Sequence, residues 1–436
     1  MNIVIKNGVV ITMDSTKSIF EKGMVLIEND TITYAGKEIT SLIPQDAKII
    51  DAENGIIMPG MINTHTHIGM SLFRTLADDT SDRLKKYLFP LEGKFVTPEL
   101  VYWASLYSLI EMIEGGTTTI ADMYYFEDKV ADAAIKAGIR GILGESILNF
   151  PAPDTKAPYG GFAYTEKFLK SYSNHPLITP ALAPHAPYSL DFENLKKTAN
   201  LAEEWDIPIL SHLAEMPFEM KQIAEEYGMS PVELYSETGL LSTRMTAAHC
   251  IYVDDKDMNL LKTSGTGVAH NVAANLKGGK GVSPALKMFD MGIPIGIGTD
   301  GPMSGNTMDL VNLLGYTAKI HKMDNKDRTV MPPQKVVEMA TIGGARALHI
   351  EDKTGTLEKG KKADVIIVST ESTVMFPIYD YYSALVYCAS PRDVDTVIIN
   401  GELIMENREI KTYSKKETRA EAEKIVAKIK KGLKDF

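Results

Sequence analysis

The 436-residue chain has little cysteine and histidine, no long apolar run and no excess of positive charge. Its two cysteines, Cys250 and Cys388, form no CxxC pair, which excludes a disulfide framework and a cysteine zinc site. No run of 18 apolar residues occurs, and the start (MNIVIKNGVVITMD) lacks the basic and apolar regions of a signal peptide. We therefore expect a cytoplasmic protein in a reducing compartment, without membrane association.

The charge balance is acidic, with 57 Asp and Glu against 46 Lys and Arg and a net charge of -11. Such a surface repels nucleic-acid phosphates and anionic headgroups, so we expect a small-molecule substrate and no nucleic-acid partner. The 44% hydrophobic and 24% charged fractions are those of a globular protein with room for one large and one smaller domain. A homo-oligomer is left open, because the 22 methionines and 19 tyrosines suit a core as well as an interface.

Short apolar runs separated by turns mark both ends of the chain. They fall in residues 1–57 and again in residues 358–410, where Asn400-Gly401 has the composition of a hairpin turn. Because neither segment is large enough to bury its own faces, we expect the two to build one small β-sandwich domain. Residues 411–436 are rich in Ala, Glu and Lys with apolar residues at four-residue spacing, which predicts a surface helix.

Between these ends, residues 58–357 alternate short apolar runs with longer amphipathic ones, a pattern typical of βα units. Eight runs have the character of buried strands, and eight parallel strands close a (β/α)8 barrel: 61–64, 117–122, 139–145, 178–183, 207–211, 245–248, 267–269 and 294–299. An open doubly wound sheet gives the same alternation, so the placement of polar residues has to decide. The long Pro- and Gly-rich stretch at 149–163 follows the third strand and is a candidate lid.

Histidine, although scarce, recurs where the predicted strands end. His65-Thr66-His67 closes the first strand, and in an extended segment residues i and i+2 point the same way. Five further polar residues follow later strands: His185, His212, His249, His270 and Asp300. Since the carboxyl ends of a parallel barrel ring one mouth, these side chains are expected to converge on one site. His175, His321 and His349 lie away from strand ends, and no chemistry is expected of them.

Imidazoles and a carboxylate arriving from three strands predict one divalent metal. His65, His67, His212 and Asp300 would hold it with a position left open, and such ligands suit zinc, with iron and other transition metals left open. Glu215, three residues after His212, is the expected proton shuttle, and Asp300 can take a proton from water. His249 is expected to donate a hydrogen bond in the site, whereas His270 is left open between packing and function.

The segments PGMINTHTH, FPLE, APHAPYS, HLAE, AAHC, AHN and GTDGPMSGN, in that order, resemble the amidohydrolase superfamily. The likeness is to its branch of methylthioadenosine/S-adenosylhomocysteine deaminases and chlorohydrolases that act on triazines. It implies a distorted (β/α)8 barrel, one divalent metal, usually zinc, and hydrolytic loss of ammonia or chloride from an aromatic nitrogen ring. By motif it assigns the metal to His65, His67, His212 and Asp300, and proton transfer to Glu215 and His249.

The same resemblance assigns two substrate contacts. Glu92 in FPLE matches a carboxylate that accepts hydrogen bonds from ribose hydroxyls, and His185 matches a histidine that contacts the substrate. One departure concerns the region after the third strand, where relatives acting on S-adenosylhomocysteine carry arginines. This chain has Glu145 there, and Lys156 is the first cation that follows. A substrate carboxylate therefore loses its bidentate partner.

We therefore expect a metal-dependent aminohydrolase of 5'-methylthioadenosine, 5'-deoxyadenosine or adenosine, with S-adenosylhomocysteine less favoured. Two alternatives remain at this point. One is a deaminase or dechlorinase of a free triazine, guanine or pterin. The other is a non-catalytic scaffold, although that reading predicts a missing ligand and none is missing.

Overall fold

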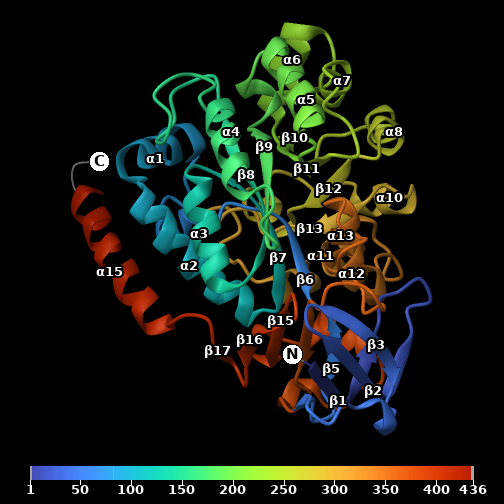
Figure 1. Ribbon diagram of the computed structural model, residues 1–436. Coiled ribbons are helices and arrows are strands. Elements are labelled where there is room, and N and C mark those ends of the chain that lie inside the picture. Colours follow the sequence, from blue (N-terminus) through green and yellow to red (C-terminus); the bar gives the residue numbers. More distant parts are fainter. Residues whose placement is uncertain (1, 82, 434–436) are drawn as a thin grey trace.

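The computed structural model describes residues 2–81 and 83–433. Eight parallel strands close into a barrel, and nine further strands form one mixed sheet beside it (Figure 1). Within the part of the chain that is described, no helix combines the length and apolar character needed to cross a bilayer.

The barrel contains all eight predicted strands, in the order expected from the sequence. They are β6 (Met61–Thr66), β7 (Thr117–Tyr124), β8 (Arg140–Ile147), β9 (Ile178–Pro184), β10 (Ile209–Leu213), β11 (Met245–His249), β12 (Gly267–His270) and β13 (Ile295–Ile297). Closure comes from the pairing of β13 with β6, through Ile297 opposite Asn63. Every strand is buried or nearly so, because helices cover the outside and side chains fill the inside. The prediction of a (β/α)8 barrel is confirmed.

The helices that surround the barrel include those expected from the amphipathic runs. Their bounds are α1 (Phe89–Phe95), α2 (Pro98–Glu114), α3 (Glu127–Ala137), α4 (Gly161–Tyr172), α5 (Phe192–Trp205), α6 (Pro217–Tyr227), α7 (Pro231–Glu237), α8 (Asp255–Ser264), α9 (Val272–Lys277), α10 (Ala285–Asp290), α11 (Leu310–Asp324), α12 (Pro333–Ala340), α13 (Ile342–Ala347), α14 (Tyr381–Tyr387) and α15 (Lys415–Gly432). Shorter helical turns lie at Thr40–Leu42, Ile68–Phe73, Leu84–Leu88, Pro187–Ser189, Thr373–Met375 and Pro391–Asp393.

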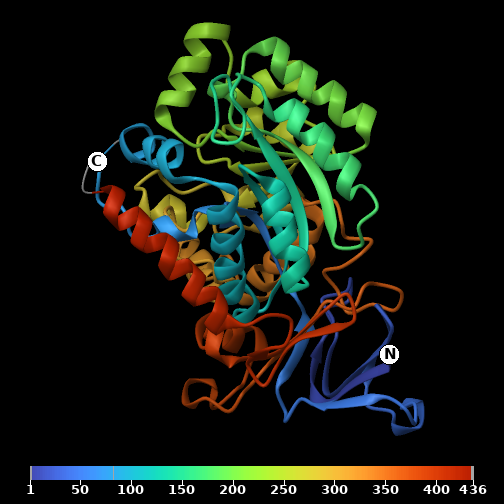
Figure 2. The same cartoon turned by 60° about the vertical axis from the view of Figure 1, so that its left-hand side comes forward.

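Both ends of the chain contribute to the mixed sheet, as the sequence predicted (Figure 2). The amino-terminal strands are β1 (Asn2–Ile11), β2 (Ile19–Glu28), β3 (Thr31–Lys37), β4 (Lys48–Asp51) and β5 (Ile56–Pro59). The carboxyl-terminal strands are β14 (Val365–Val368), β15 (Val394–Ile399), β16 (Glu402–Glu406) and β17 (Glu409–Ile410). The two sets join where β5 pairs antiparallel with β14, with Met58 opposite Ile366. The domain boundaries at residues 57 and 358 stay a prediction.

A buried ion pair ties the sheet to the barrel. Arg140 at the start of β8 donates from Nε and Nη2 to the two carboxylate oxygens of Asp364, each over 3.2 Å. Asp364 also accepts the backbone N–H of Asn400 at 2.7 Å, which anchors the turn before β16. On another side α15 lies along α2, with Ala422, Ile425 and Ile429 buried (Figure 1). These contacts stabilise the barrel and so fix the positions of its strand ends.

Candidate functional site

A cavity of about 710 Å³ opens at the carboxyl ends of the barrel strands. Its wall includes four residues predicted from strand ends, His67, His185, His212 and Asp300, together with the predicted shuttle Glu215. Their positions at strand ends predict that these residues meet at one mouth, and the fold brings them there. The cavity is therefore the candidate site.

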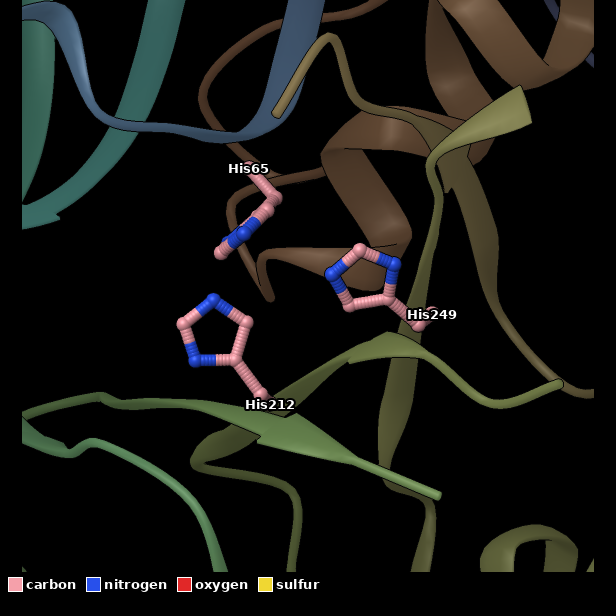
Figure 3. Close-up of side chains that lie close together, drawn as sticks. All are labelled: His65, His212 and His249. Atoms are coloured by element: carbon pink, nitrogen blue, oxygen red, sulfur yellow. The ribbon is translucent and has the colours of Figure 1, made fainter. Parts of the chain in front are cut away.

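Three histidine rings from different strands face one another at the base of this mouth (Figure 3). His65 comes from β6, His212 from β10 and His249 from β11. The ring centroid of His65 lies 4.9 Å from that of His212 and 5.7 Å from that of His249. His67, just after β6, lies 4.7 Å from His65. The HxH spacing thus directs the rings of His65 and His67 into one cluster.

Asp300 completes this cluster from the segment after β13. Its Oδ1 lies 3.4 Å from Nε2 of His67 and 4.0 Å from Nε2 of His65. The ligand atoms of His65, His67 and Asp300 all lie within 4.8 Å of one another, and so do those of His65, His212 and His249. Spacings of this order let several side chains share a single ion.

The hydrogen bonds of the rings show that these residues fit a divalent metal. Nδ1 of His67 donates to the carbonyl oxygen of Met123 at 2.5 Å, and Nδ1 of His212 to that of His185 at 2.7 Å. A proton fixed on Nδ1 leaves the Nε2 lone pair pointing into the cluster. Nε2 of His65 is buried without a hydrogen-bond partner in the described part of the chain. Such unpaired imidazole nitrogens beside a carboxylate are a suitable donor set for a metal.

Burial also favours the neutral, ligand-competent form of two rings. It holds the pKa of His65 and of His212 well below the ordinary value for histidine. His67 differs, because its contact with the Asp300 carboxylate outweighs burial and raises its pKa to about 8. A metal that binds His67 has to displace this proton.

Glu215 and His249 lie beside the cluster. Oε1 of Glu215 is 3.6 Å from Nε2 of His249, which is itself 3.8 Å from Oδ2 of Asp300. Nδ1 of His249 donates to Oδ1 of Asn275 at 2.9 Å, which fixes the orientation of the ring. Burial alone would raise the pKa of Glu215, but its interactions with His249 and with the ammonium group of Lys280 hold it well below its usual range. Glu215 is thus an ionised carboxylate inside the cavity.

The backbone at these strand ends is held in an uncommon conformation. Positive φ angles occur at Ala214 (51°), His249 (74°), Cys250 (45°) and Asp300 (59°), none of which is glycine. Each such residue costs on the order of 1–3 kcal/mol and needs support from its surroundings. Part of that support is Glu219, whose carboxylate accepts the N–H of Ala214 at 2.7 Å and of Glu215 at 2.9 Å. The strain therefore belongs to the turns that aim the site residues inward.

The two predicted substrate contacts also line the cavity. Glu92 on α1 is 3% exposed and accepts a hydrogen bond from the hydroxyl of Tyr125 at 3.4 Å. Burial raises the pKa of Glu92 to about 7. His185 follows β9, and its ring centroid lies 4.8 Å from that of His212. Both residues are therefore near enough to the cluster to touch a molecule that occupies the cavity.

The remaining histidines lie outside the cavity wall. His270 ends β12, and its Nε2 is 3.2 Å from Nε2 of His321 on α11, with both rings buried. His175 accepts the N–H of Leu177 in a loop, and His349 follows α13. His321, expected to be remote from any strand end, thus reaches one through tertiary packing.

Glu145 stands in the region where the family resemblance implies an arginine, and it belongs to a second group of acids. This acid cluster consists of Asp122 on β7, Glu127 at the start of α3, Glu145 on β8 and Asp154 in the loop after β8. Glu145 accepts the N–H of Glu127 at 3.1 Å, and Asp154 accepts that of Phe126 at 2.9 Å. Glu145 is fully buried and absent from the cavity wall, and Lys156 is exposed. Neither residue is placed to bind a substrate carboxylate.

Sequence reasoning missed several residues of the cavity wall, three cations among them. Arg83 donates to the carbonyl of Met303, Lys277 to Asp78 at 2.6 Å, and Lys280 to Glu215. A signal for Lys280 existed, since it stands between glycines in Gly278-Gly279-Lys280-Gly281.

The sequence and fold have clear counterparts among known proteins. The model of the amidohydrolase family matches residues 56–404. The chain is 39% identical to 5-methylthioadenosine/S-adenosylhomocysteine deaminase 1 of Syntrophus aciditrophicus, covering 100% of this chain and 99% of the relative. A deaminase of the same name, without the number, from Thermoanaerobacter pseudethanolicus is 39% identical, again over 100% and 99%.

Solved structures agree with the architecture. An adenosine deaminase from Xanthomonas campestris with bound zinc superimposes with a TM-score of 0.95 at 28% identity, covering 98% of each chain. An atrazine chlorohydrolase from Arthrobacter aurescens TC1 complexed with zinc has a TM-score of 0.90 at 23% identity, over 97% of this chain and 100% of the other. At that identity the second likeness shows the shared fold alone.

Proposed function

The chain belongs to the amidohydrolase family, and from this premise we propose that it is a metal-dependent aminohydrolase of an adenine-type nucleoside. The reaction replaces the 6-amino group of the ring by oxygen and releases ammonia. The observation that carries the proposal is the convergence of the histidine and Asp300 cluster with Glu215 and His249 on one cavity. Relatives at 39% identity over the full chain carry a deaminase name, which supports the same reaction.

His65, His67, His212 and Asp300 are the proposed ligands of one divalent ion, and zinc is the proposed metal. The imidazole and carboxylate donors support this choice, as does the zinc bound to the adenosine deaminase of the same fold. When bound, such an ion lowers the pKa of water towards about 7 and so supplies a nucleophile at neutral pH.

The chain's own residues handle the protons. Glu215, ionised at the start, takes one proton of a water molecule and delivers it to the adjacent ring nitrogen, which makes C6 more electrophilic. The water oxygen then bonds to C6, and Asp300 accepts the second proton at a carboxylate oxygen. His249 donates a hydrogen bond to the oxygen that adds, held in place by Asn275. The C6–N bond then breaks, the proton held by Asp300 passes to the departing amino group, and ammonia leaves, while the ring nitrogen keeps the proton delivered by Glu215.

Glu92 and His185 are the proposed substrate contacts. Glu92 accepts hydrogen bonds from the ribose hydroxyls, and His185 contacts the bound substrate. We propose uncharged nucleosides (5'-methylthioadenosine, 5'-deoxyadenosine and adenosine) as the main substrates. The three cations of the cavity wall already bind acceptors on the chain. This supports the proposal that S-adenosylhomocysteine, with its carboxylate, is a poorer substrate than the uncharged nucleosides.

A substrate panel tests the proposal. The zinc-loaded enzyme is incubated with the three nucleosides, S-adenosylhomocysteine, guanine, a pterin and a chlorotriazine, and release of ammonia or chloride is measured. We expect ammonia from the uncharged nucleosides first. Turnover confined to guanine, the pterin or the triazine would overturn the nucleoside assignment, and a metal-free, inert protein would favour a scaffold.

A further inference from the structure

Lys280 lies on a glycine turn that points its side chain into the candidate site. The turn covers residues 278–281, between α9 and α10, and φ is 59° at Gly279 and 116° at Gly281. Residues with a side chain rarely adopt the second of these angles. Two hydrogen bonds fix the lysine backbone: its N–H donates to the carbonyl of Asn275 at 3.0 Å, and its carbonyl accepts the hydroxyl of Tyr252 at 2.6 Å. The turn therefore fixes the backbone of Lys280 and with it the point from which the side chain extends.

The ammonium group of Lys280 is paired inside the cavity. The side chain is 13% exposed, and Nζ donates to Oε1 of Glu215. Burial disfavours the ammonium form, but the carboxylates of Glu215 and Asp300 more than compensate and raise the pKa of Lys280. A charge held so far from water has to be matched by a partner in good geometry. Lys280 and Glu215 therefore act as a unit.

This pairing distinguishes the two oxygens of Glu215. Oε1 receives the Lys280 ammonium and also faces Nε2 of His249 at 3.6 Å. Oε2 of Glu215 takes part in neither of these two contacts. One oxygen is thus fixed by a cation, and the other is left for a proton exchanged with a bound molecule. A glutamate free to rotate would present either oxygen, in many orientations.

We propose that Lys280 is a positioning residue for deamination: its ammonium fixes Oε1 of Glu215, so that Oε2 is presented to the ring nitrogen of the substrate. This inference rests on the proposed role of Glu215 as proton shuttle. Correct placement of an acid–base group affects the chemical step and contributes little to substrate binding. Loss of Lys280 should therefore appear in kcat and leave KM nearly unchanged.

Lys280→Met tests this placement, with Lys287→Met as the matched control. Lys287 lies on α10 and pairs with Asp255 at the surface, away from the cavity wall. We expect Lys280→Met to lower kcat for 5'-methylthioadenosine about 100-fold, with KM within about threefold and the bound metal unchanged. Lys287→Met should match the wild type in all three. A kcat of Lys280→Met within about threefold of the wild type would overturn the proposal.

Chemical rescue separates positioning from a purely structural role. In Lys280→Ala, added propylammonium can occupy the vacated space, and we expect it to restore kcat at least about tenfold in a saturable way. Propanol at the same concentration should have no effect. A metal-loaded, folded Lys280→Ala that propylammonium does not restore contradicts the proposal.

The two proposals fail in different ways. If the wild type turns over another heterocycle and no nucleoside, the proposed substrate is wrong, and the same kcat ratios on the accepted heterocycle still test Lys280. If Glu215→Gln retains full kcat while Lys280→Met does not, the shuttle role itself is wrong and the inference about Lys280 falls with it.

Discussion

Two groups of buried carboxyls lie near the carboxyl ends of the barrel strands: Asp300 with Glu215, and the acid cluster with Glu127 and Glu145, whose pKa values are shifted in the opposite direction. Asp300 and Glu215 are surrounded by imidazoles and Lys280, which hold the pKa of both carboxyls low despite burial. In the acid cluster, burial raises the pKa of Glu127 and Glu145 well above the ordinary value, and no cation offsets it within the described residues. Burial is therefore similar in both groups, and the available partners decide the charge.

The acid cluster is held together by protons. Five of its oxygens are buried without a donor in the described chain: Asp122 Oδ2, Glu127 Oε1 and Oε2, Glu145 Oε1 and Asp154 Oδ1. Glu127 faces Asp122 and Glu145 faces Asp154, and two carboxyls can bond only if one keeps its proton. The cluster thus anchors the loop after β8 through Asp154. The role of residues 149–163 as a lid stays a prediction.

Removing an imidazole should disrupt the charged group most strongly. In His65→Ala we expect the bound metal to be lost and deaminase activity to fall on the order of 10⁴-fold, since residues of one site act as a unit. Metal analysis and ammonia release measure both effects. His175→Ala, in a loop outside the cavity wall, is the matched control and should retain both. Full activity in His65→Ala would contradict the ligand assignment.

Glu215→Gln tests whether the ionised carboxylate works as an acid and base. The amide has nearly the same shape but cannot exchange a proton, so kcat should fall about 10²- to 10⁴-fold while the metal is kept. Glu226→Gln, exposed on α6, serves as the control. Steady-state kinetics with adenosine measure the effect. An unchanged kcat would show that another group carries the proton.

Glu92 is intermediate between the two groups, because it is buried and yet lines the cavity. Glu92→Ala should raise KM for nucleosides about 10- to 100-fold, the equivalent of a hydrogen bond to a charged acceptor. KM for a free base should hardly change. With its pKa raised to about 7, Glu92 ionises as the pH rises through 7, so KM of the wild type for nucleosides should fall over that range. A pH-independent KM would show that ionised Glu92 does not bind the ribose.

Glu145→Gln tests the neutral group and has the smallest expected effect. The folded state keeps a proton that the unfolded chain releases above the ordinary pKa of 4.5. Stability of the wild type should therefore fall as the pH rises from 4.5 towards the raised pKa. The amide of Glu145→Gln does not titrate, so this pH dependence should disappear. It amounts to on the order of 1 kcal/mol in the free energy of unfolding. Urea unfolding at pH 5 and pH 8 measures the free energy of unfolding of both proteins. An equal change with pH in the wild type and in Glu145→Gln would contradict a protonated Glu145.

Much of the architecture followed from local pattern. The eight strands of the barrel were predictable because each is a short apolar run between longer amphipathic ones. The positions of His65, His67, His212 and Asp300 followed as well, since a residue at a strand end has a known place in a closed barrel. Their roles remain predictions that the ligand variants test.

Other contacts could not be predicted, because they join segments remote in the sequence. Lys280 reaches Glu215 across 65 positions, and His321 reaches His270 across 51. Glu219 lies on α6 and accepts the backbone N–H groups that shape the turn of Glu215, a contact that helical periodicity does not indicate. Such contacts depend on the path of each loop, which periodicity does not encode.

Local sequence pattern is enough to predict the barrel, the pairing of both chain ends in one sheet and the strand ends at which polar residues stand. These features depend on spacing along the chain and on burial of apolar faces, both of which are local properties. The charge of each buried carboxyl could not be predicted in this way, because it depends on the cations and imidazoles that other segments bring within a few ångströms. Glu145 and Glu215 look alike in sequence, and their neighbours in space make one a protonated anchor and the other an ionised carboxylate facing the cavity.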